Sequence, residues 1–276
     1  MHSGKIFKKT IYEYYEEEGR HSLPWRHTKD PYRILVSEIM LQQTQVARVE
    51  KYYRVFLKQF PNFRRLSAAR AEDVLRVWQG LGYNRRAFAL RTLARVVTEK
   101  YRGRLPHDVE ALESLPGIGS YTARAIRAFA FDEPDVVLET NIRRVFIHFF
   151  FPHRKHVTDA ELERCIKRTL DKENPREWYW ALMDYGAMLG RSAATVGVVK
   201  NPNRRSAHYR KQSRFAGSDR ELRGKTLRLL LSRRDVAPSS LSFLLKESKT
   251  KVDKVVSALA REGFIEKKGK YLRLTR

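Results

Sequence analysis

The sequence predicts an all-α fold over most of its length, followed by a small winged-helix domain of mixed α and β structure. Up to Leu189, apolar residues recur at helical spacing and almost no segment alternates as a β-strand does. Beyond a basic segment, three further helical patterns precede two short strand-like runs around the turn Lys268-Gly269. Three helices followed by a basic hairpin is the arrangement of a winged helix, whose third helix reads a groove when it binds DNA. The alternative is that this domain packs on the main domain or on a protein partner.

Start and stop residues place the helices in order. Pro31 and the pair Asn174-Pro175 mark helix starts, because proline fits the first helical position, while Pro61 and Gly263 mark ends. The expected helices of the all-α part cover residues 6–18, 31–42, 46–60, 71–79, 86–101, 109–114, 122–131, 142–151, 159–169 and 176–188. Those of the winged-helix domain cover residues 222–231, 239–245 and 250–262, with the two strands within 264–274.

Size and charge limit the classes of protein to which the chain can belong. The 276 residues suit one large or two ordinary domains, and a hydrophobic content of 42% can form real cores. We predict a core over 1–190, a basic, loosely structured arm or linker over 191–219, and the winged-helix domain over 220–276. A formal charge of +25 draws the protein to polyanions such as nucleic acid, without indicating any sequence preference.

Cysteine usage and hydropathy exclude several other classes. Cys165 is the only cysteine, which excludes an internal disulfide and any multi-cysteine metal or iron–sulfur site, and fits a reducing compartment. The N-terminus has no apolar core of a signal peptide, and no apolar run approaches membrane-spanning length. The histidines are scattered, so we assign none to a metal. We expect a cytoplasmic, nucleoid-associated protein that has no membrane partner.

A glycine pair marks a candidate anion site. Gly117 and Gly119 stand directly ahead of an Ala-rich amphipathic pattern, which predicts a tight hairpin opening onto a helix N-terminus. Unpaired amides and the helix dipole make such a terminus attractive to anions, and a nucleic-acid phosphate is the obvious anion for so basic a chain. A purely structural turn stays open as an alternative. A dinucleotide site is disfavoured, because the third glycine of that fingerprint is missing.

Two carboxylates are the candidates for acid–base chemistry. Glu38 lies in the middle of a helical pattern with apolar neighbours, which favours burial over a solvated helix surface. A buried carboxylic acid has a raised pKa and can protonate a leaving group at neutral pH. Glu139 follows the helix after the glycine pair, and we expect it to be ionised beside developing positive charge. Such a pair suits the breaking of a glycosidic bond, although sequence spacing does not show that the two meet.

Five segments together carry a resemblance to a known family. They are Leu23-Pro24-Trp25-Arg26, Ser37-Glu38-Ile39-Met40-Leu41-Gln42-Gln43-Thr44-Gln45-Val46, Gly80-Leu81-Gly82-Tyr83, Leu115-Pro116-Gly117-Ile118-Gly119 and Met183-Asp184-Tyr185-Gly186-Ala187-Met188. In this order they resemble MutY, the adenine-specific member of the helix-hairpin-helix (HhH-GPD) DNA glycosylase superfamily, and Glu38–Val46 is the most specific of them. The resemblance implies an all-α core of two lobes, approximately 30–135 and 1–29 plus 136–190, with a flipped nucleotide between them.

The resemblance also implies an activity and a set of site residues. It implies a monofunctional base-excision-repair glycosylase, acting as a monomer on double-stranded DNA and hydrolysing the N-glycosidic bond of an adenine opposite 8-oxoguanine or guanine. Glu38 would protonate the adenine ring nitrogen and help water attack, and Glu139 would take the place of the family's aspartate beside the oxocarbenium-like sugar. The other matched positions are the duplex wedge, Gln43 and Tyr83; the base pocket, Trp25, Arg26 and Asp184; and the phosphate-binding amides of Gly117, Gly119 and Tyr121.

Three departures from the family pattern change the expectation. Glu139 is one methylene longer than the usual aspartate, so its carboxylate must be set back. Tyr121 replaces the Schiff-base lysine of glycosylase/lyases, so we expect Tyr121 at the catalytic site and base removal without strand cleavage. No cysteine follows Met183–Met188, so we expect no iron–sulfur cluster and no other cofactor, while a non-catalytic cation at the hairpin stays compatible. The chain ends in a winged-helix candidate where MutY has a domain resembling nucleotide hydrolases that reads 8-oxoguanine.

Two other functions remain open at this point. Tyrosine at the position of Tyr121 also occurs in thymine–guanine mismatch glycosylases, so thymine or uracil opposite guanine is an alternative substrate. The second alternative is a catalytically degenerate, DNA-binding protein, which the winged helix and the change at Glu139 would suit. The run Gln42–Val46 favours adenine, and the presence of Glu38 argues against a degenerate protein.

Overall fold

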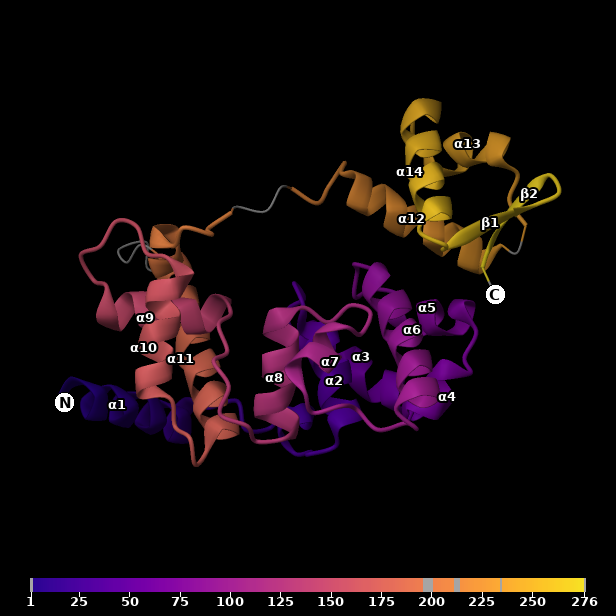
Figure 1. Cartoon of the computed structure of the whole chain (residues 1–276). Helices are drawn as coiled ribbons and strands as arrows, with labels where there is room; N and C mark the ends of the chain where they lie inside the picture. The colour runs from indigo at the N-terminus through magenta and orange to yellow at the C-terminus, as the bar shows by residue number, and fades with distance from the viewer. Residues whose placement is uncertain (1, 196–200, 211–213, 234, 276) are drawn as a thin grey trace. The chain divides into compact units, whose positions relative to one another are not determined.

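A computed structural model describes residues 2–195, 201–210, 214–233 and 235–275 (Figure 1). The chain forms two compact units, Met1–Glu38 with Leu105–Lys211, and Ile39–Arg104 with Gln212–Arg276. Both units are discontinuous in sequence, and the division falls within helix α2 (Pro31–Leu41). This grouping differs from the predicted lobes, because residues 105–135 join the first unit, where α8 (Ser120–Ala130) packs against α11 (Pro175–Thr195).

Long helices around an aromatic cluster make up the first unit. Its remaining elements are α1 (His2–Glu18), the 3₁₀ helix η1 (Pro24–Arg26), α7 (Val109–Glu113), α9 (Thr140–Phe150), α10 (Asp159–Thr169) and the 3₁₀ helix η2 (Pro202–Arg205). Helix α11 packs against both α9 and α1. At their junction the buried ring of Phe7 meets Phe146 and Trp178 edge-on, with ring centroids 5.4 and 5.6 Å away, the geometry that aromatic quadrupoles favour.

The expected loose arm is partly wrong. Helix α11 continues to Thr195, and η2 follows at Pro202–Arg205 with Asn203 buried. The Asn203 side-chain amide donates to the Thr140 carbonyl oxygen at 2.9 Å, and the Val157 amide donates to the Arg205 carbonyl oxygen at 2.8 Å. These hydrogen bonds tie the segment to the first unit. The rest of the predicted arm includes residues 196–200 and 211–213, which lie outside the described residues.

The second unit begins with four helices, α3 (Val46–Gln59), α4 (Phe63–Ser67), α5 (Ala71–Trp78) and α6 (Arg85–Lys100). Helix α6 packs on α4 and α5. The guanidinium of Arg86 on α6 lies at the end of α2, where it donates to the carbonyl oxygens of Ile39 and Met40, both at 2.8 Å. The last carbonyls of a helix have no intrahelical donor, so this buried arginine satisfies them. Burial lowers the pKa of Arg86 to about 10, which leaves the side chain charged at neutral pH.

The same unit contains the winged-helix domain. It consists of α12 (Asp219–Ser232), the 3₁₀ helix η3 (Pro238–Ser240), α13 (Leu241–Leu245), α14 (Lys249–Arg261), β1 (Ile265–Lys268) and β2 (Tyr271–Leu274). The strands are antiparallel, with Ile265 opposite Leu274 and Lys268 opposite Tyr271. Gly269 takes a φ of 60° in the two-residue turn, as such hairpins require. The predicted fold class, an all-α core followed by a small α+β domain, is confirmed.

Helix length and hydropathy also bear on a membrane. Within the described ranges, no helix combines the length and the apolar character that crossing a bilayer demands.

Candidate active site

Glu38 is a buried acid on α2, with 7% of its surface exposed. The apolar neighbours that predicted its burial pack into the core around it, and Leu35, Val36 and Ile39 are fully buried. The pKa of Glu38 is raised to about 7, chiefly because burial disfavours the charged form. The hydrogen bond from Tyr121 opposes this shift, and the negative charge of Glu139 adds to it. About half of such a group is protonated at neutral pH, so it can serve as a general acid.

Tyr121 is the hydrogen-bond partner of this acid. Its hydroxyl donates to Glu38 Oε2 over 3.2 Å, joining the start of α8 to α2. Burial raises the pKa of Tyr121 well above its usual value, and the charges of Glu38 and Glu139 add to the effect. The phenol therefore stays protonated and remains a donor to the carboxylate.

The glycine turn before Tyr121 opens onto space. Gly117 adopts a left-handed φ of 83°, as the sequence predicts, whereas Gly119 is extended, with φ −106°. Gly119 is the N-cap residue of α8, and a Cβ added there would meet no heavy atom within 4 Å. The second glycine is therefore not required by the turn. It leaves the first-turn amides of α8, which lack intrahelical acceptors, open to a ligand.

Glu139 is the N-cap residue of α9. Its Oε1 accepts hydrogen bonds from the backbone amides of Asn141 and Ile142 at 2.5 and 2.9 Å. The extra methylene thus folds the carboxylate back onto the helix start, where the dipole favours negative charge. Burial raises the pKa of Glu139, opposed by these two amides and by the charges of Arg144 and Arg143. The sequence predicts an ionised group here, and its ionised form is the one that the amides and arginines stabilise.

Arg144 supports this cap from behind. Its guanidinium is buried, donates to Asn141 Oδ1 at 2.8 Å, and contacts the Gly186 carbonyl oxygen on α11. A Cβ on Gly186 would lie 2.3 Å from the Asn141 carbonyl oxygen, so only glycine allows α9 and α11 to approach this closely. The glycine of the segment Met183–Met188 is therefore explained by packing. Sequence reasoning missed Arg144, because one basic residue on an amphipathic helix carries no signal of a distant partner.

Asp184 lies in an arginine cluster. Its carboxylate is 2% exposed and accepts from Arg26 Nη1 and Nη2 at 2.8 Å each, and from the backbone amide and Nε of Arg20 at 2.7 Å each. Burial alone would raise the pKa of Asp184, but the hydrogen bonds and charges of Arg26 and Arg20 outweigh it and lower the pKa. Trp25 is buried beside Arg26 in η1. The cluster fixes η1 to α11, and the base-pocket role of these residues stays a prediction.

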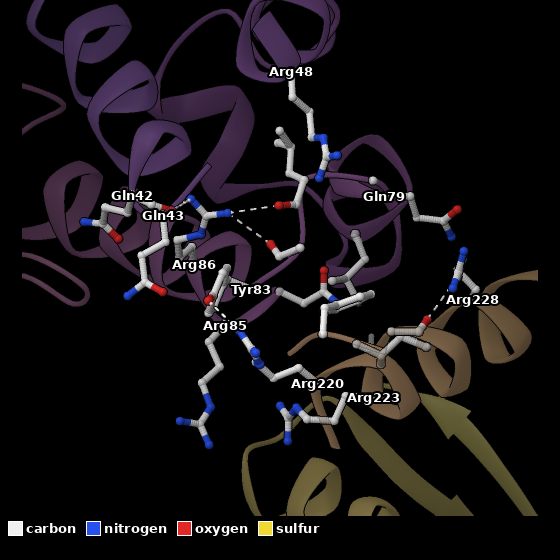
Figure 2. A pocket seen from close by; sticks show the side chains of 18 of the residues that line it. Gln42, Gln43, Arg48, Gln79, Tyr83, Arg85, Arg86, Arg220, Arg223 and Arg228 are labelled. Atoms are coloured by element: carbon white, nitrogen blue, oxygen red, sulfur yellow. Dashed lines mark hydrogen bonds between the residues drawn. The ribbon is translucent and has the colours of Figure 1, made fainter. Parts of the chain in front are cut away.

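The two expected wedge residues belong to the second unit, where both line one pocket (Figure 2). Gln43 follows the end of α2 with a φ of 53°, and Tyr83 precedes α6 with a φ of 47°. Left-handed backbone in non-glycine residues costs free energy and concentrates at functional sites. Tyr83 is 37% exposed, and Gly80 ahead of it has no room for a side chain, because a Cβ would lie 2.0 Å from Tyr52 Oη.

The described ranges contain no group of three or more His, Cys, Asp or Glu side chains arranged to hold a metal ion. The expectation that the protein acts without a cofactor stays a prediction.

Comparisons with known proteins show which proteins the chain is similar to. The family model described as "HhH-GPD superfamily base excision DNA repair protein" matches residues 36–170. The adenine DNA glycosylase of Buchnera aphidicola subsp. Baizongia pistaciae is 37% identical over 188 residues, which is 67% of this chain but 53% of that protein. The chain thus spans about half the length of that relative. The adenine DNA glycosylase of Mycolicibacterium smegmatis is 33% identical over 264 residues, covering 91% of this chain and 89% of the relative.

A solved structure has a similar fold. A thermostable thymine-DNA glycosylase matches with a TM-score of 0.60 and 30% identity, over 67% of this chain and 87% of that one. The sequence range of the match to the family model contains Glu38, Tyr121 and Glu139.

Proposed function

The chain belongs to the HhH-GPD superfamily of base excision DNA repair proteins, and on this premise we propose that it is a monofunctional DNA glycosylase that removes adenine paired with 8-oxoguanine or guanine. One observation carries the proposal: a buried Glu38 with a pKa of about 7, hydrogen-bonded by Tyr121 and within electrostatic reach of Glu139. Adenine is the base named in the relatives from Buchnera and Mycolicibacterium.

The proposed reaction assigns one task to each residue. Protonated Glu38 donates its proton to a ring nitrogen of the extruded adenine, so that the base leaves with the electron pair of the glycosidic bond. The carboxylate of Glu139, fixed at the start of α9, stabilises the positive charge that develops on the sugar. Ionised Glu38 then takes a proton from the water that attacks C1′.

Tyr121 limits the enzyme to hydrolysis. Its phenol positions Glu38 and has no amine that could form a Schiff base with the sugar. We therefore propose that the protein acts on double-stranded DNA as a monomer, without an iron–sulfur cluster, and leaves the strand uncut.

Thymine or uracil opposite guanine is the second candidate substrate. The observation that favours it is the likeness to the thermostable thymine-DNA glycosylase, at 30% identity. The remaining alternative, a catalytically degenerate DNA-binding protein, fits poorly, because an inactive protein gains nothing from a buried acid with a raised pKa.

One assay separates the three functions. The purified protein is incubated with duplexes that carry A:8-oxoguanine, A:G, T:G or U:G, and each sample is then divided between hot alkali and buffer. Strand breaks that depend on alkali and occur only with adenine support the proposal. Breaks with thymine or uracil would favour the second substrate, and no breaks with any duplex would favour a protein without glycosylase activity.

A further inference from the structure

The segment that leads into Glu139 has no regular secondary structure. Residues 132–139 form neither helix nor strand, and Glu139 itself is extended, with φ −127° and ψ −179°. The position of its carboxylate therefore depends on the first turn of α9, where it accepts from the backbone amides of Asn141 and Ile142. Contacts that fix this turn also fix the carboxylate.

The 3₁₀ helix η2 packs against α9 and contacts that first turn. Nδ2 of Asn203 donates to the Thr140 carbonyl oxygen at 2.9 Å, and the Asn203 side chain is buried. Asn201 fixes Asn203 in turn, because its Oδ1 accepts from the Asn203 backbone amide at 3.1 Å. The ring of Pro202 restricts the backbone between them. The side-chain donor of Asn203 is thus held at the start of α9.

One peptide unit joins Asn203 to Glu139. The carbonyl oxygen of Thr140 and the amide of Asn141 belong to the same planar peptide group. Its oxygen accepts from Asn203 Nδ2, and its N–H donates to Glu139 Oε1 at 2.5 Å, the shorter of the two bonds from backbone amides to this carboxylate. A peptide that accepts a hydrogen bond at its oxygen becomes a stronger donor at its nitrogen, because hydrogen bonds in a chain polarise one another.

Packing alone does not account for an asparagine at this position. Asn203 is 5% exposed, and in the described part of the chain its Oδ1 is buried without a hydrogen-bond partner. A buried acceptor without a partner costs free energy, which an apolar side chain of similar shape would avoid. The amide is accounted for by its donor, which reaches the peptide next to Glu139.

The charged and titratable groups that face Glu139 come from three helices. Burial raises the pKa of Glu139, and the two backbone amides and the charges of Arg144 and Arg143 on α9 oppose this shift. Glu38 on α2 and Tyr121 on α8 face it as well, since the charge of Glu139 raises the pKa of both. The asparagine of η2 is uncharged, so it acts on Glu139 through the geometry and polarity of hydrogen bonds.

We propose that Asn203 is a positioning residue of the glycosylase, which holds the Thr140–Asn141 peptide so that its amide binds the ionised carboxylate of Glu139. This inference rests on the proposed function, in which that carboxylate stabilises the positive charge on the sugar. Asn203 acts through the peptide and is not itself a catalytic residue. Part of the segment that the sequence predicts as a loose arm thus contributes to the active site.

Two substitutions at this position separate the donor from the packing. Asn203→Ala removes the amide and most of the side-chain volume, whereas Asn203→Leu removes the amide and keeps a γ-branched shape. Both should lower the single-turnover rate on an A:8-oxoguanine duplex at pH 7 by about tenfold, because the rate depends steeply on how catalytic groups are placed. The Kd for the same duplex should change less than about twofold, since the net charge that draws the protein to DNA is unchanged.

The ionisation of Glu139 gives a readout that packing alone would not move. In carbon-13 NMR of the protein labelled at the glutamate carboxyl groups, the signal missing from Glu139→Gln identifies this residue. Its titration should move to higher pH in both Asn203 variants, because weaker donation from the amide favours the neutral carboxyl group. The acidic limb of the pH–rate profile should move to higher pH by about 0.5, while the alkaline limb set by Glu38 stays in place.

Asn62→Ala is the matched control. Asn62 is the N-cap residue of α4 in the second unit, where its Oδ1 accepts from the Arg65 amide at 2.9 Å. Its removal also deletes an asparagine that bonds the start of a helix, so it should cost stability but leave the rate and both limbs of the profile unchanged. Circular dichroism during heating verifies that each variant is folded at the temperature of the assays.

The outcomes separate this inference from the proposed function. If Asn203→Leu keeps the wild-type rate and the wild-type titration of Glu139 while Asn203→Ala loses both, the position serves packing and the inference fails. If neither variant changes the rate or the titration, Asn203 does not act on Glu139. If the wild type releases no base from any duplex but the titration still moves in both variants, the proposed function fails and the link between Asn203 and the carboxylate stands.

Discussion

Burial shifts pKa values in opposite directions at the acidic centre around Glu38 and in the pocket lined by Tyr83 and Arg86. At the acidic centre, burial brings two carboxylates and a phenol together and raises the pKa of each. In the pocket, burial lowers the pKa of Arg86, yet the side chain stays charged because backbone carbonyls surround it. The first region can exchange protons near neutral pH, whereas Arg86 stays charged there.

The largest expected effect is at the acid itself. Glu38→Gln keeps the size and removes the proton donor, so adenine release under single-turnover conditions should fall by about 10²–10⁴, the usual contribution of general acid–base catalysis. The Kd for the same duplex should change less than twofold. Glu99→Gln, at an exposed position on α6, is the matched control and should leave both quantities unchanged. If Glu38→Gln released adenine as fast as the wild type, Glu38 would not be the general acid and the contrast between the two regions would not hold.

The next effect concerns the carboxylate at the start of α9. Glu139→Ala removes both the charge and the N-cap, so we expect base release to fall about 100-fold, and the free energy of unfolding to fall by about 1 kcal/mol. Glu139→Asp keeps a capping carboxylate and should retain activity within about tenfold and nearly all of the stability. Single-turnover rates and urea unfolding measure the two quantities. If Glu139→Ala were as active as Glu139→Asp, the negative charge at this position would not contribute to base release.

The pH dependence sharpens the same contrast. Glu38 must be protonated to act, so the single-turnover rate should fall as pH rises through about 7, the pKa of this group. The hydrogen bond from Tyr121 lowers that pKa, so Tyr121→Phe should move the alkaline limb of the profile to higher pH. A profile that is flat between pH 6 and 9, or a shift to lower pH in the variant, would contradict the assignment.

Protein stability should depend on pH for the same reason. The pKa of Glu38 in the folded protein lies above its ordinary value of 4.5, so the folded state holds the proton more tightly than the unfolded one. The stability that this proton provides is present at low pH and is lost as pH rises from about 4.5 to about 7. Glu38→Gln should therefore unfold at a higher temperature than the wild type at pH 8, and the gap should narrow at pH 5. A gap that does not change with pH would argue that Glu38 titrates normally.

The smallest effect is expected at the link to the winged-helix domain. Glu262→Gln removes the charge that pairs with Arg85 and Arg223, but both arginines are partly solvated and the Phe88–Phe264 contact stays. We expect a loss of at most about 1 kcal/mol of stability and a change in the Kd for DNA of no more than a few fold. Urea unfolding and fluorescence anisotropy check these values. A Glu262→Gln protein that no longer binds DNA would show that DNA binding depends on this link.

Local signals in the sequence predict the members of the acidic centre, although they do not show that these residues meet. The apolar neighbours of Glu38 indicated burial, and the glycine turn placed Tyr121 at a helix start. Glu139 directly precedes a helix that begins at Thr140, so its position also permits a capping role. The prediction from sequence covers only an ionised group beside developing positive charge. The identity of the family followed from short motifs, because their residues are fixed by chemistry or by close packing, as at Gly186.

Long-range pairs could not be predicted in this way. Arg26 and Asp184 are 158 positions apart, and Arg85 and Glu262 are 177 apart, so no periodic pattern connects them. The hydrogen bond of Asn203 to Thr140 is also long-range. For this reason the polar, basic composition of the segment predicts only a loose arm. The contacts of the winged-helix domain with α6 include the Phe88–Phe264 pair and the carboxylate of Glu262, which only the folded chain brings together.

The ionisation of Glu38 is the most direct test of this account. Carbon-13 NMR of the protein labelled at the glutamate carboxyl groups, titrated from pH 4 to pH 9, would follow each glutamate, and the signal missing from Glu38→Gln identifies the one of interest. The account predicts that this signal titrates near pH 7, and that the signal of Glu139 is also displaced above its ordinary pKa. If every glutamate, including this one, titrates near its ordinary pKa of about 4.5, Glu38 does not have a raised pKa and the proposed mechanism fails.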